Sequence, residues 1–585
     1  MSLRLKKPYQ ALLLILVTLG IYYPTLFAPF NSLDDQLLVN TLLNQQGFSW
    51  SRHFSPGGLY DYYRPLVTLS FEIDHHIGGL QEPFMHLFNV LVHAVNVLLV
   101  WLFARRFGRF IRNSSDLIPL LAALLFAVHP IHTETVNWIM GRTDLLAGTF
   151  CFAALWSLVI FLERRQMGWG ILSGVTLLGG ALCKETALFL VPGACFLLVC
   201  RAVGGGRQWR GRWLLLPFYS IAIGAYFFLR WGAFQTDRGL SHTTKLVASA
   251  VGVASSPGVS EATATHFPWL DAVRVALKAS GFYAVKLFQP LPLNFGINHV
   301  DPVFLVPGLC LVVLLTVSAW RRQPIGWLFL VAASIAVSAL AVLYTQLAWT
   351  PVAERYMYIP CGPFLVGLVY LVGSKVTLPV GRAVAAMLVP AVIGGAVWAT
   401  ATRNIVWQDN LTLYQDTVRK SPDFARAKTQ LAMALRERGR KEEALALLGE
   451  NSSASGGEAM MNRAAALWEE GDYEAARAEL LELLENPRGI EIKILNNLVA
   501  ITMEQANKTE DEDLKRLYYE DILGWLKRIY SLWPNGFVSY RIGRVHLILN
   551  NRSAAQRAFA KAAETLPPDS LYHEPAAKLA RTLAE

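Results

Sequence analysis

Residues 117–165 read LIPLLAALLFAVHPIHTETVNWIMGRTDLLAGTFCFAALWSLVIFLERR, and the fold of the whole chain is interpreted from this stretch. Two apolar runs, 117–131 and 143–162, flank a short polar segment, and the second run ends in a charged tail. A run of about 20 apolar residues is long enough to cross a bilayer as a helix. The stretch therefore predicts two membrane-spanning helices joined by a polar turn that carries histidine, glutamate, arginine and aspartate.

The same pattern extends through the first two thirds of the chain. Of its 585 residues, 54% are hydrophobic and 16% are charged, whereas soluble domains carry about a quarter of charged residues. This composition excludes a disordered chain, a collagen-like fibre and a disulfide scaffold. We expect residues 1–405 to form an all-α, polytopic membrane domain of about eleven spans. These spans are 11–29, 86–104, 117–131, 143–162, 169–183, 186–200, 213–230, 303–320, 325–347, 356–373 and 383–400.

The basic residues predict the orientation of this domain. Residues 1–405 hold 29 lysines and arginines against 16 acidic residues, whereas residues 406–585 hold 24 against 27. With eleven spans and a cytoplasmic N-terminus, every basic cluster lies on the cytoplasmic side, as positive-inside topology requires. The run 271–289 must then lie at the interface rather than cross. The basic clusters are Arg4 to Lys7, Arg105 to Arg112, Arg164 and Arg165, Arg201 to Arg212, Arg321 and Arg322, and Lys375 with Arg382.

Residues 406–585 are predicted to form a helical repeat domain. Residues 428–447 read KTQLAMALRERGRKEEALAL and residues 462–481 read NRAAALWEEGDYEAARAELL. Gly439 and Gly471 lie 32 residues apart, and an alanine follows each of them five residues later. This pattern, repeated at 539–563, resembles the tetratricopeptide repeat, a helix–turn–helix unit of 34 residues. We expect three to five helix pairs in a short superhelix, and an unrelated helical bundle is the alternative.

The polar residues that topology does not explain gather at the predicted non-cytoplasmic ends of the spans. Charged groups at membrane depth are costly and usually functional. Each group has a structural alternative: a solvated loop, hydrogen-bonded histidines, local ion pairs, or helix-to-helix contacts for the His86 to Asn96 stripe. Their convergence from separate segments on one membrane face favours a site. The candidates are Asp34, Asp35, Arg64, His86, His129, His132, Glu134, Arg142, Asp144, Lys184, Glu185, Glu354, Arg355 and Tyr356.

Five segments carry a resemblance to a known family. In chain order they read DDQLL at 34–38, YYRPLVTLSFEIDHHIGGLQEPFMHLFNVLVHAVN at 62–96, ALLFAVHPIHTETVNWIMGRTDLLAG at 123–148, LCKETALFLVP at 182–192 and VAERYMYIP at 352–360. Together they resemble the transmembrane and tetratricopeptide-repeat O-mannosyltransferases, which have the C-type fold of membrane glycosyltransferases.

The resemblance implies an inverting transfer of one sugar from a polyprenyl phosphate, with an acidic residue of the first external loop as base. We expect Asp34 to be this base, with Asp35 as the second candidate. Arg142 and Arg355 are expected to bind the lipid phosphate, because arginine suits phosphate recognition. His132 and Glu134 are expected to shape the substrate pocket. The other pocket candidates are Arg64, His86, His129, Asp144, Lys184, Glu185, Glu354 and Tyr356.

The expected acceptor is a serine or threonine hydroxyl of a protein outside the cytoplasm, held by the repeats. We expect no nucleic-acid partner and no cofactor, although the acidic pair alone does not decide metal dependence. The expected location is a bacterial inner membrane, with the site and the repeats on the periplasmic side. Two alternatives stay open: a glycosyltransferase of the same fold that modifies a lipid or cell-envelope glycan, and a non-catalytic scaffold.

Overall fold

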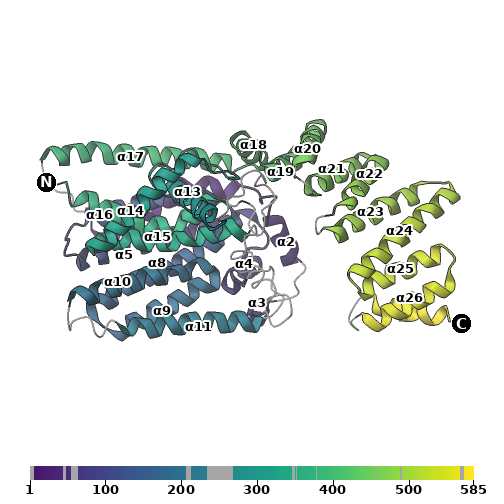
Figure 1. Ribbon diagram of the computed structural model, residues 1–585, viewed down its shortest axis with the longest axis horizontal. Helices are drawn as coiled ribbons and strands as arrows, with labels where there is room; N and C mark the ends of the chain where they lie inside the picture. The colour runs from purple at the N-terminus through teal and green to yellow at the C-terminus, as the bar shows by residue number, and fades with distance from the viewer. Residues whose placement is uncertain are drawn as a thin grey trace. The chain divides into compact units, whose positions relative to one another are not determined.

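A computed structural model gives the fold of the chain (Figure 1). It describes residues 6–43, 48–54, 63–205, 213–233, 268–345, 350, 352–376, 379–455, 457–487, 490–566 and 572–584. The chain divides into two compact units, Met1–Ser421 and Pro422–Glu585. Within the described ranges the secondary structure is helical, apart from an isolated bridge between Ile297 and Val352.

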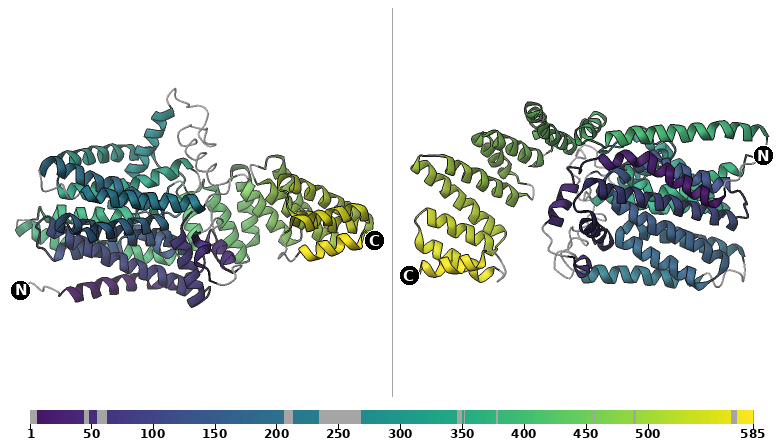
Figure 2. Two further views of the ribbon diagram at one scale, coloured as in Figure 1. Left: turned by 90° about the horizontal axis from the view of Figure 1, so that it is seen from below. Right: turned by 180° about the vertical axis from the view of Figure 1, so that it is seen from behind.

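The first unit is a bundle of long helices packed side by side (Figures 1 and 2). Its first half contains α1 (Lys7–Tyr22), α2 (Asp35–Leu43), α3 (Trp50–Phe54), α4 (Pro65–Gly78), α5 (Glu82–Phe110), α6 (Leu117–Val128), α7 (Thr133–Asn137), α8 (Arg142–Arg164), α9 (Met167–Cys183), α10 (Leu190–Gly205) and α11 (Leu215–Ala233). Its second half contains α13 (Pro268–Phe288), α14 (Leu305–Arg321), α15 (Pro324–Thr345), α16 (Tyr358–Gly373), α17 (Pro379–Val406) and α18 (Asn410–Lys420). Short 3-10 turns connect some of them: η1 (Tyr23–Phe27), η2 (Pro130–His132), η3 (Ile139–Gly141), η4 (Glu185–Phe189), η7 (Pro302–Phe304) and η8 (Glu354–Met357).

Several of these helices have the length and apolarity of membrane spans. Six pass both criteria in the described part of the chain, and a seventh does if α6 and the bent segment Pro130–Asn137 form one span. The six are Lys7–Phe27, Glu82–Phe110, Ile139–Arg164, Pro302–Arg321, Glu354–Gly373 and Pro379–Val406. Three shorter apolar helices, Met167–Cys183, Glu185–Phe196 and Pro324–Leu340, coincide with further predicted spans. The predicted span 213–230 lies on α11, and the count of eleven stays a prediction.

The polar turn between α6 and α8 is built from short helical pieces. Pro130 follows the end of α6, and a proline cannot continue the helical hydrogen-bond ladder. The chain bends by 46° there and passes through η2, α7 and η3 before α8 begins. Gly141 permits this close turn, because a Cβ at that position would lie 2.3 Å from the carbonyl oxygen of Thr135. The bend therefore brings the polar residues of this segment to the end of the bundle.

The helix over 271–289 is observed as α13, which is not among the membrane-length apolar helices. It packs against α14 through glycines on both sides. A Cβ on Gly281 would lie 2.0 Å from the carbonyl oxygen of Phe304, and one on Gly308 would lie 2.1 Å from that of Leu277. The two backbones thus approach more closely than any larger residue would allow.

The second unit is a series of helices, α19 (Ala425–Glu437), α20 (Lys441–Ser455), α21 (Gly457–Glu470), α22 (Tyr473–Glu485), α23 (Glu491–Lys508), α24 (Glu512–Leu532), α25 (Gly536–Ile548), α26 (Arg552–Thr565) and α27 (His573–Thr582). Successive helices pack in pairs, α19 on α20, α21 on α22, α23 on α24 and α25 on α26. Gly439 and Gly471 form the turns of the first two pairs at φ +75° and +86°, a conformation that favours glycine. Ala444 and Ala476 are fully buried after these turns. The pairs match the predicted helix–turn–helix units, and a tetratricopeptide superhelix stays a prediction.

The two units meet in sequence later than the predicted boundary at 405/406. Helix α18 belongs to the first unit, because its polar residues are tied to the end of the helical bundle. Tyr414 donates a hydrogen bond to Asn31 at 2.9 Å, and Asp416 pairs with Arg403 on α17. The apolar run ends before α18, so composition alone gave no sign of this packing.

Candidate active site

An ion pair between Arg355 and Glu134 lies at the centre of the predicted polar cluster. Arg355 belongs to η8 and Glu134 to α7, and the Arg355 guanidinium donates to one Glu134 carboxylate oxygen. The backbone N–H of Arg355 donates to the other oxygen at 3.1 Å. The rings of Trp138 and Tyr356 lie 5.1 and 4.9 Å from the guanidinium carbon, and the Tyr356 hydroxyl accepts from Arg355 at 3.3 Å. Arg355 is therefore held in a fixed orientation.

One member of the acidic pair in the first loop, Asp34, lies within electrostatic range of this arginine. Burial raises the pKa of Asp34 above its usual value, and the positive charge of Arg355 acts in the opposite direction. Asp35 is only 1% exposed, and burial raises its pKa to about 7. Its carboxylate accepts the backbone N–H of Asn31 at 2.8 Å, so Asp35 closes the loop on itself. Asp34 is the more exposed of the two carboxylates, and it is the one whose pKa is lowered by the positive charge of Arg355.

A second ion pair extends the cluster across Tyr356. Lys184, which follows α9, contacts both carboxylate oxygens of Asp144 in the first turn of α8, at 2.6 and 2.7 Å. Its ammonium also lies 5.3 Å from the centre of the Tyr356 ring. Tyr356 is thus shared by Arg355 and Lys184, and the two cations lie within electrostatic range of each other.

A third group joins α4, η4 and α11. Arg64 and Arg230 both contact Glu185, at 3.4 and 3.0 Å, and Arg230 also donates to the hydroxyl of Tyr226 at 2.8 Å. Arg230 is not among the sequence candidates, because the sequence predicts it to be the last residue of the span 213–230. Its position at the non-cytoplasmic end of a predicted span, outside every cytoplasmic basic cluster, was the signal that could have identified it.

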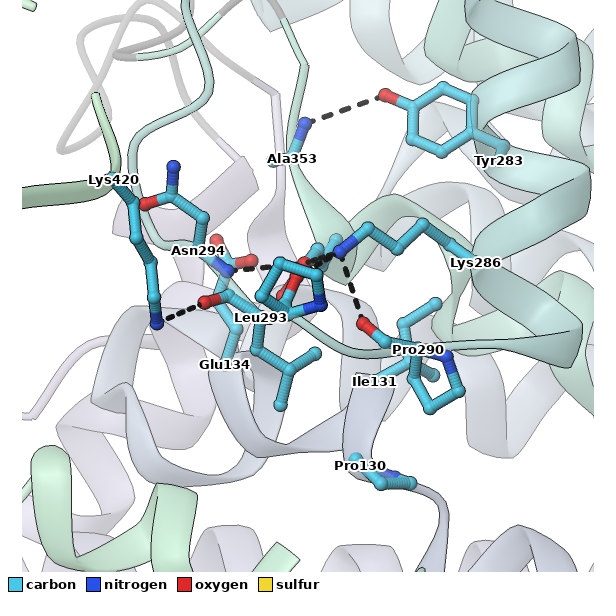
Figure 3. A network of polar contacts seen from close by, with 12 residues as sticks. Pro130, Ile131, Glu134, Tyr283, Lys286, Pro290, Leu293, Asn294, Ala353 and Lys420 are labelled. Atoms are coloured by element: carbon cyan, nitrogen blue, oxygen red, sulfur yellow. Dashed lines mark hydrogen bonds and ion pairs between the residues drawn. The ribbon is translucent and has the colours of Figure 1, made fainter. Parts of the chain in front are cut away.

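Glu354, the first residue of η8, contacts Lys286 and Asn294, both of which are labelled in Figure 3. It pairs with Lys286 of α13 at 2.9 Å and accepts the backbone N–H of Asn294 at 3.2 Å. Lys286 also donates to the carbonyl oxygens of Pro290, at 3.0 Å, and Pro292. The two charges therefore fasten α13 and the following loop to η8. Lys286, which the sequence suggested only as a charge on an interfacial helix, thus supports the site.

Arg142 occupies a closed environment. It has no exposed surface, pairs with Asp74 of α4 at 2.6 Å, and donates to Asn89 and to the carbonyl oxygen of Met85, each at 3.0 Å. The rings of Phe71 and Phe88 each lie 4.2 Å from its guanidinium carbon. A guanidinium enclosed in this way reaches an outside phosphate only if the ion pair opens. These surroundings favour a structural role, in contrast to the role expected from the sequence.

The histidines lie inside the bundle. His132 is fully buried between the rings of Phe126 and Tyr358, whose centroids lie 4.4 and 4.7 Å from its own. His129 contacts the carbonyl oxygen of Leu287 at 3.3 Å, and His86 is 1% exposed. The stripe from His86 to Asn96 is buried, as its helical spacing predicts. These buried side chains pack inside the bundle and have a structural role next to the polar turn.

The structure thus divides the sequence candidates into two sets. Those near one another at the end of the bundle are Asp34, Arg64, Glu134, Asp144, Lys184, Glu185, Arg355 and Tyr356. Those in supporting positions are Asp35, His86, His129, His132, Arg142 and Glu354. No group of three metal-ligating side chains with suitable geometry occurs in the described ranges. The first set is rich in alternating charges, an arrangement suited to binding an anion beside a reacting hydroxyl.

Comparison with known proteins shows that part of this chain is similar to one family. Residues 65–231 match the family described as dolichyl-phosphate-mannose-protein mannosyltransferase. Protein O-mannosyl-transferase Tmtc1 of Drosophila melanogaster is 36% identical over 163 residues, which are 28% of this chain and 18% of that protein. Human protein O-mannosyl-transferase TMTC2 is 35% identical over 185 residues, 28% of this chain and 21% of that protein.

Human protein O-mannosyl-transferase TMTC4 is 36% identical over 155 residues, 24% of this chain and 21% of that protein. The chain thus matches about a fifth of the length of these relatives. The family match includes Glu134, Asp144, Lys184 and Glu185, whereas Asp34 and Arg355 lie outside it. The chain is thus similar to the dolichyl-phosphate-mannose-protein mannosyltransferase family over residues 65–231 and to these protein O-mannosyl-transferases over 24–28% of its length.

Proposed function

We propose that this protein is a membrane glycosyltransferase that moves one sugar, mannose or another hexose, from a polyprenyl phosphate to a protein hydroxyl outside the cytoplasm. The observation that carries this proposal is the position of Asp34. Its carboxylate has a raised pKa and lies within electrostatic range of the fixed Arg355 guanidinium. A base beside a phosphate-binding cation is what a one-step displacement from a glycosyl phosphate requires.

In the proposed reaction, the acceptor hydroxyl oxygen attacks the anomeric carbon of the donor. The hydroxyl proton passes to Asp34, and the bond between the anomeric carbon and the phosphate oxygen breaks with its electron pair on the phosphate. Positive charge develops on the sugar ring in the transition state, as in other glycosyl transfers. The single displacement inverts the anomeric configuration. Arg355 stabilises the departing phosphate with two parallel donors, for which arginine is better suited than lysine.

The other residues act around this pair. Lys184 and Arg64 are the nearest additional cations for the phosphate, and Tyr356 supplies an apolar face between two charges. Glu134 positions Arg355, and Asp144 positions Lys184. Arg142, expected from the sequence to bind the phosphate, instead holds α4 and α8 together, and the phosphate role passes to Arg355 with its cationic neighbours. The histidines, Asp35 and Glu354 are positioning residues.

The finer architecture belongs to the same proposal. Eleven spans with a cytoplasmic N-terminus would place the site and the tetratricopeptide repeats on the outer face, the periplasm in a bacterial inner membrane. The support is the one-sided distribution of the basic clusters. A lipid-linked donor reaches a site at a membrane surface without leaving the bilayer. The repeats would hold the protein acceptor, which fits their separation from the apolar unit.

Transfer by the purified full-length protein tests the function. In lipid nanodiscs supplied with isotopically labelled mannosyl-phosphoryl polyprenol and with envelope proteins, lipids and glycans, we expect label on serine or threonine of protein. The control is the Asp34→Asn variant. Label on lipid or glycan alone would replace the protein acceptor by the first alternative. No label in any fraction, with each common hexose donor, would favour a non-catalytic scaffold.

The pH dependence of transfer gives a second test. Because Asp34 must be ionised to accept a proton and burial raises its pKa above the usual 3.8, kcat/KM should fall as the pH falls through this raised pKa. The Arg355 charge holds this pKa down, so Arg355→Met should move the acidic limb to higher pH. Arg355→Lys keeps the charge and should leave the limb in place while weakening donor use. If the acidic limb of Arg355→Met is unchanged, the charge of Arg355 does not influence the pKa of Asp34, which contradicts the proposed pairing.

A further inference from the structure

A cationic pocket lies at the end of α8 opposite the candidate site. It is a cavity of about 240 Å³ between α5, α8 and α9. Four arginines and two tryptophans are among the residues that line it: Arg105, Arg106, Arg109, Arg164, Trp156 and Trp169. The apolar side chains of Leu102 and Ile160 complete its wall. The cavity thus combines concentrated positive charge with a hydrophobic lining.

Its location separates it from the candidate active site. Helix α8 begins with Arg142 and Asp144 at the site and ends at Arg164 in this pocket. At 1.5 Å per residue, the helix between Asp144 and Arg164 is about 30 Å long, the thickness of the hydrocarbon core of a bilayer. Helix α8 packs against both α5 and α9. The pocket is therefore a separate site.

Arg106 distinguishes this pocket from an ordinary basic loop. The residue is 7% exposed, and its Nη2 contacts Glu163 at 2.9 Å. Its Nε has no hydrogen-bond partner among the residues that the structure describes. The acids near these arginines are Glu163 and Asp116, so positive charge remains in excess. A buried guanidinium without full compensation is costly, and an anion in the cavity would remove that cost.

The positive-inside rule alone does not explain this arrangement. That rule requires only that arginines lie on one side of the membrane, where they normally remain exposed. Arg321 and Arg322 at the end of α14 behave in this way, since both are exposed. Arg164 and Arg109 could similarly compensate the carboxyl ends of α8 and α5. Neither effect accounts for turning Arg106 inward, against its like-charged neighbours, into a cavity lined with tryptophan.

We propose that this pocket binds the phosphate head group of an anionic membrane lipid, with the start of an acyl chain against the tryptophans. The arginines provide charge-assisted donors for phosphate oxygens. Indole rings are typical of membrane interfaces, where one side is polar and the other apolar. The apolar wall favours an amphiphile over free phosphate. This site is independent of the proposed sugar transfer.

Native mass spectrometry of the purified protein tests the pocket. Protein in neutral detergent is titrated with phosphatidylglycerol, phosphatidylcholine or inorganic phosphate. We expect the anionic lipid to bind selectively, and Arg105→Gln/Arg109→Gln to weaken that binding about 25-fold, given roughly a fivefold effect per lost arginine. The matched control is Arg321→Gln/Arg322→Gln, which removes the same charge from an exposed cluster and should retain the binding.

Two other outcomes would overturn the proposal. Equal loss of lipid in the two double variants would overturn the pocket, because it would show general attraction to surface charge. Binding of inorganic phosphate as tight as that of lipid would overturn the lipid assignment. Arg106→Lys is a further variant for the same titration. It keeps the charge in the cavity but removes the Nε that has no hydrogen-bond partner among the described residues. It should reduce retention of the anionic lipid without changing the thermal melting temperature.

Discussion

Replacement of Asp34 by asparagine is expected to lower the rate of sugar transfer by about 10²–10⁴-fold, the usual cost of losing a general base. Asparagine keeps the size of the side chain but cannot take the acceptor proton. Donor binding should survive, because the phosphate contacts are assigned to Arg355 and its cationic neighbours. The measurement is single-turnover transfer by purified protein, together with the affinity for a non-transferable donor analogue.

Asp35→Asn is the matched control for this variant. Asp35 is buried and bound to the backbone of Asn31, so it is not positioned to replace Asp34 without rebuilding the loop. With a pKa of about 7 it is partly protonated at neutral pH, and the neutral amide should be tolerated much better than at position 34. The double variant should resemble Asp34→Asn. Full transfer by the double variant would eliminate the acid–base role of this pair and favour the scaffold.

The helices were predictable from the sequence because the patterns that specify them are local. Each predicted span falls on a helix, and the turns at Gly439 and Gly471 lie where the repeat places them. Two features were not predictable. The division at Ser421 depends on contacts made by α18 with distant residues such as Asn31. The number of helices that cross the membrane depends on the surrounding lipid as well as on helix length.

The sequence indicated candidate residues for the site but not the contacts between them. The topology predicted from the basic clusters puts Asp34, Glu134, Lys184 and Arg355 on the same side of the membrane. Which side chains form ion pairs depends on the tertiary structure. Nothing in the sequence links Glu134 to Arg355, which lies 221 positions later. The same limit explains Arg142. Its position at the start of a span suggested an open site, whereas α4 and α5 enclose it with Asp74 and two phenylalanines.

Arg142 therefore leads to a prediction about stability. Arg142→Met should destabilise the protein by about 3–5 kcal/mol, because it leaves the buried Asp74 carboxylate without its partner. Replacing both residues, as Arg142→Met/Asp74→Leu, should recover most of this loss, since no charge then remains buried. Arg64→Gln is the comparison variant: its pair with Glu185 is partly exposed, and its loss should cost about 1 kcal/mol or less. The measurement is thermal unfolding of the purified proteins in one detergent.

The pH dependence of the Arg142→Met deficit separates a structural from a ligand-binding role. Burial raises the pKa of Asp74, and Arg142 opposes that shift. Without the arginine, the folded-state pKa moves further above the unfolded value, so protonation of Asp74 relieves the penalty at low pH. Stability should then be lost as the pH rises, and the deficit should be larger at pH 9 than at pH 6. If Arg142→Met instead melts like the wild type at both pH values but no longer binds the donor analogue, Arg142 contacts the phosphate, and the ion pair with Asp74 must open when the donor arrives.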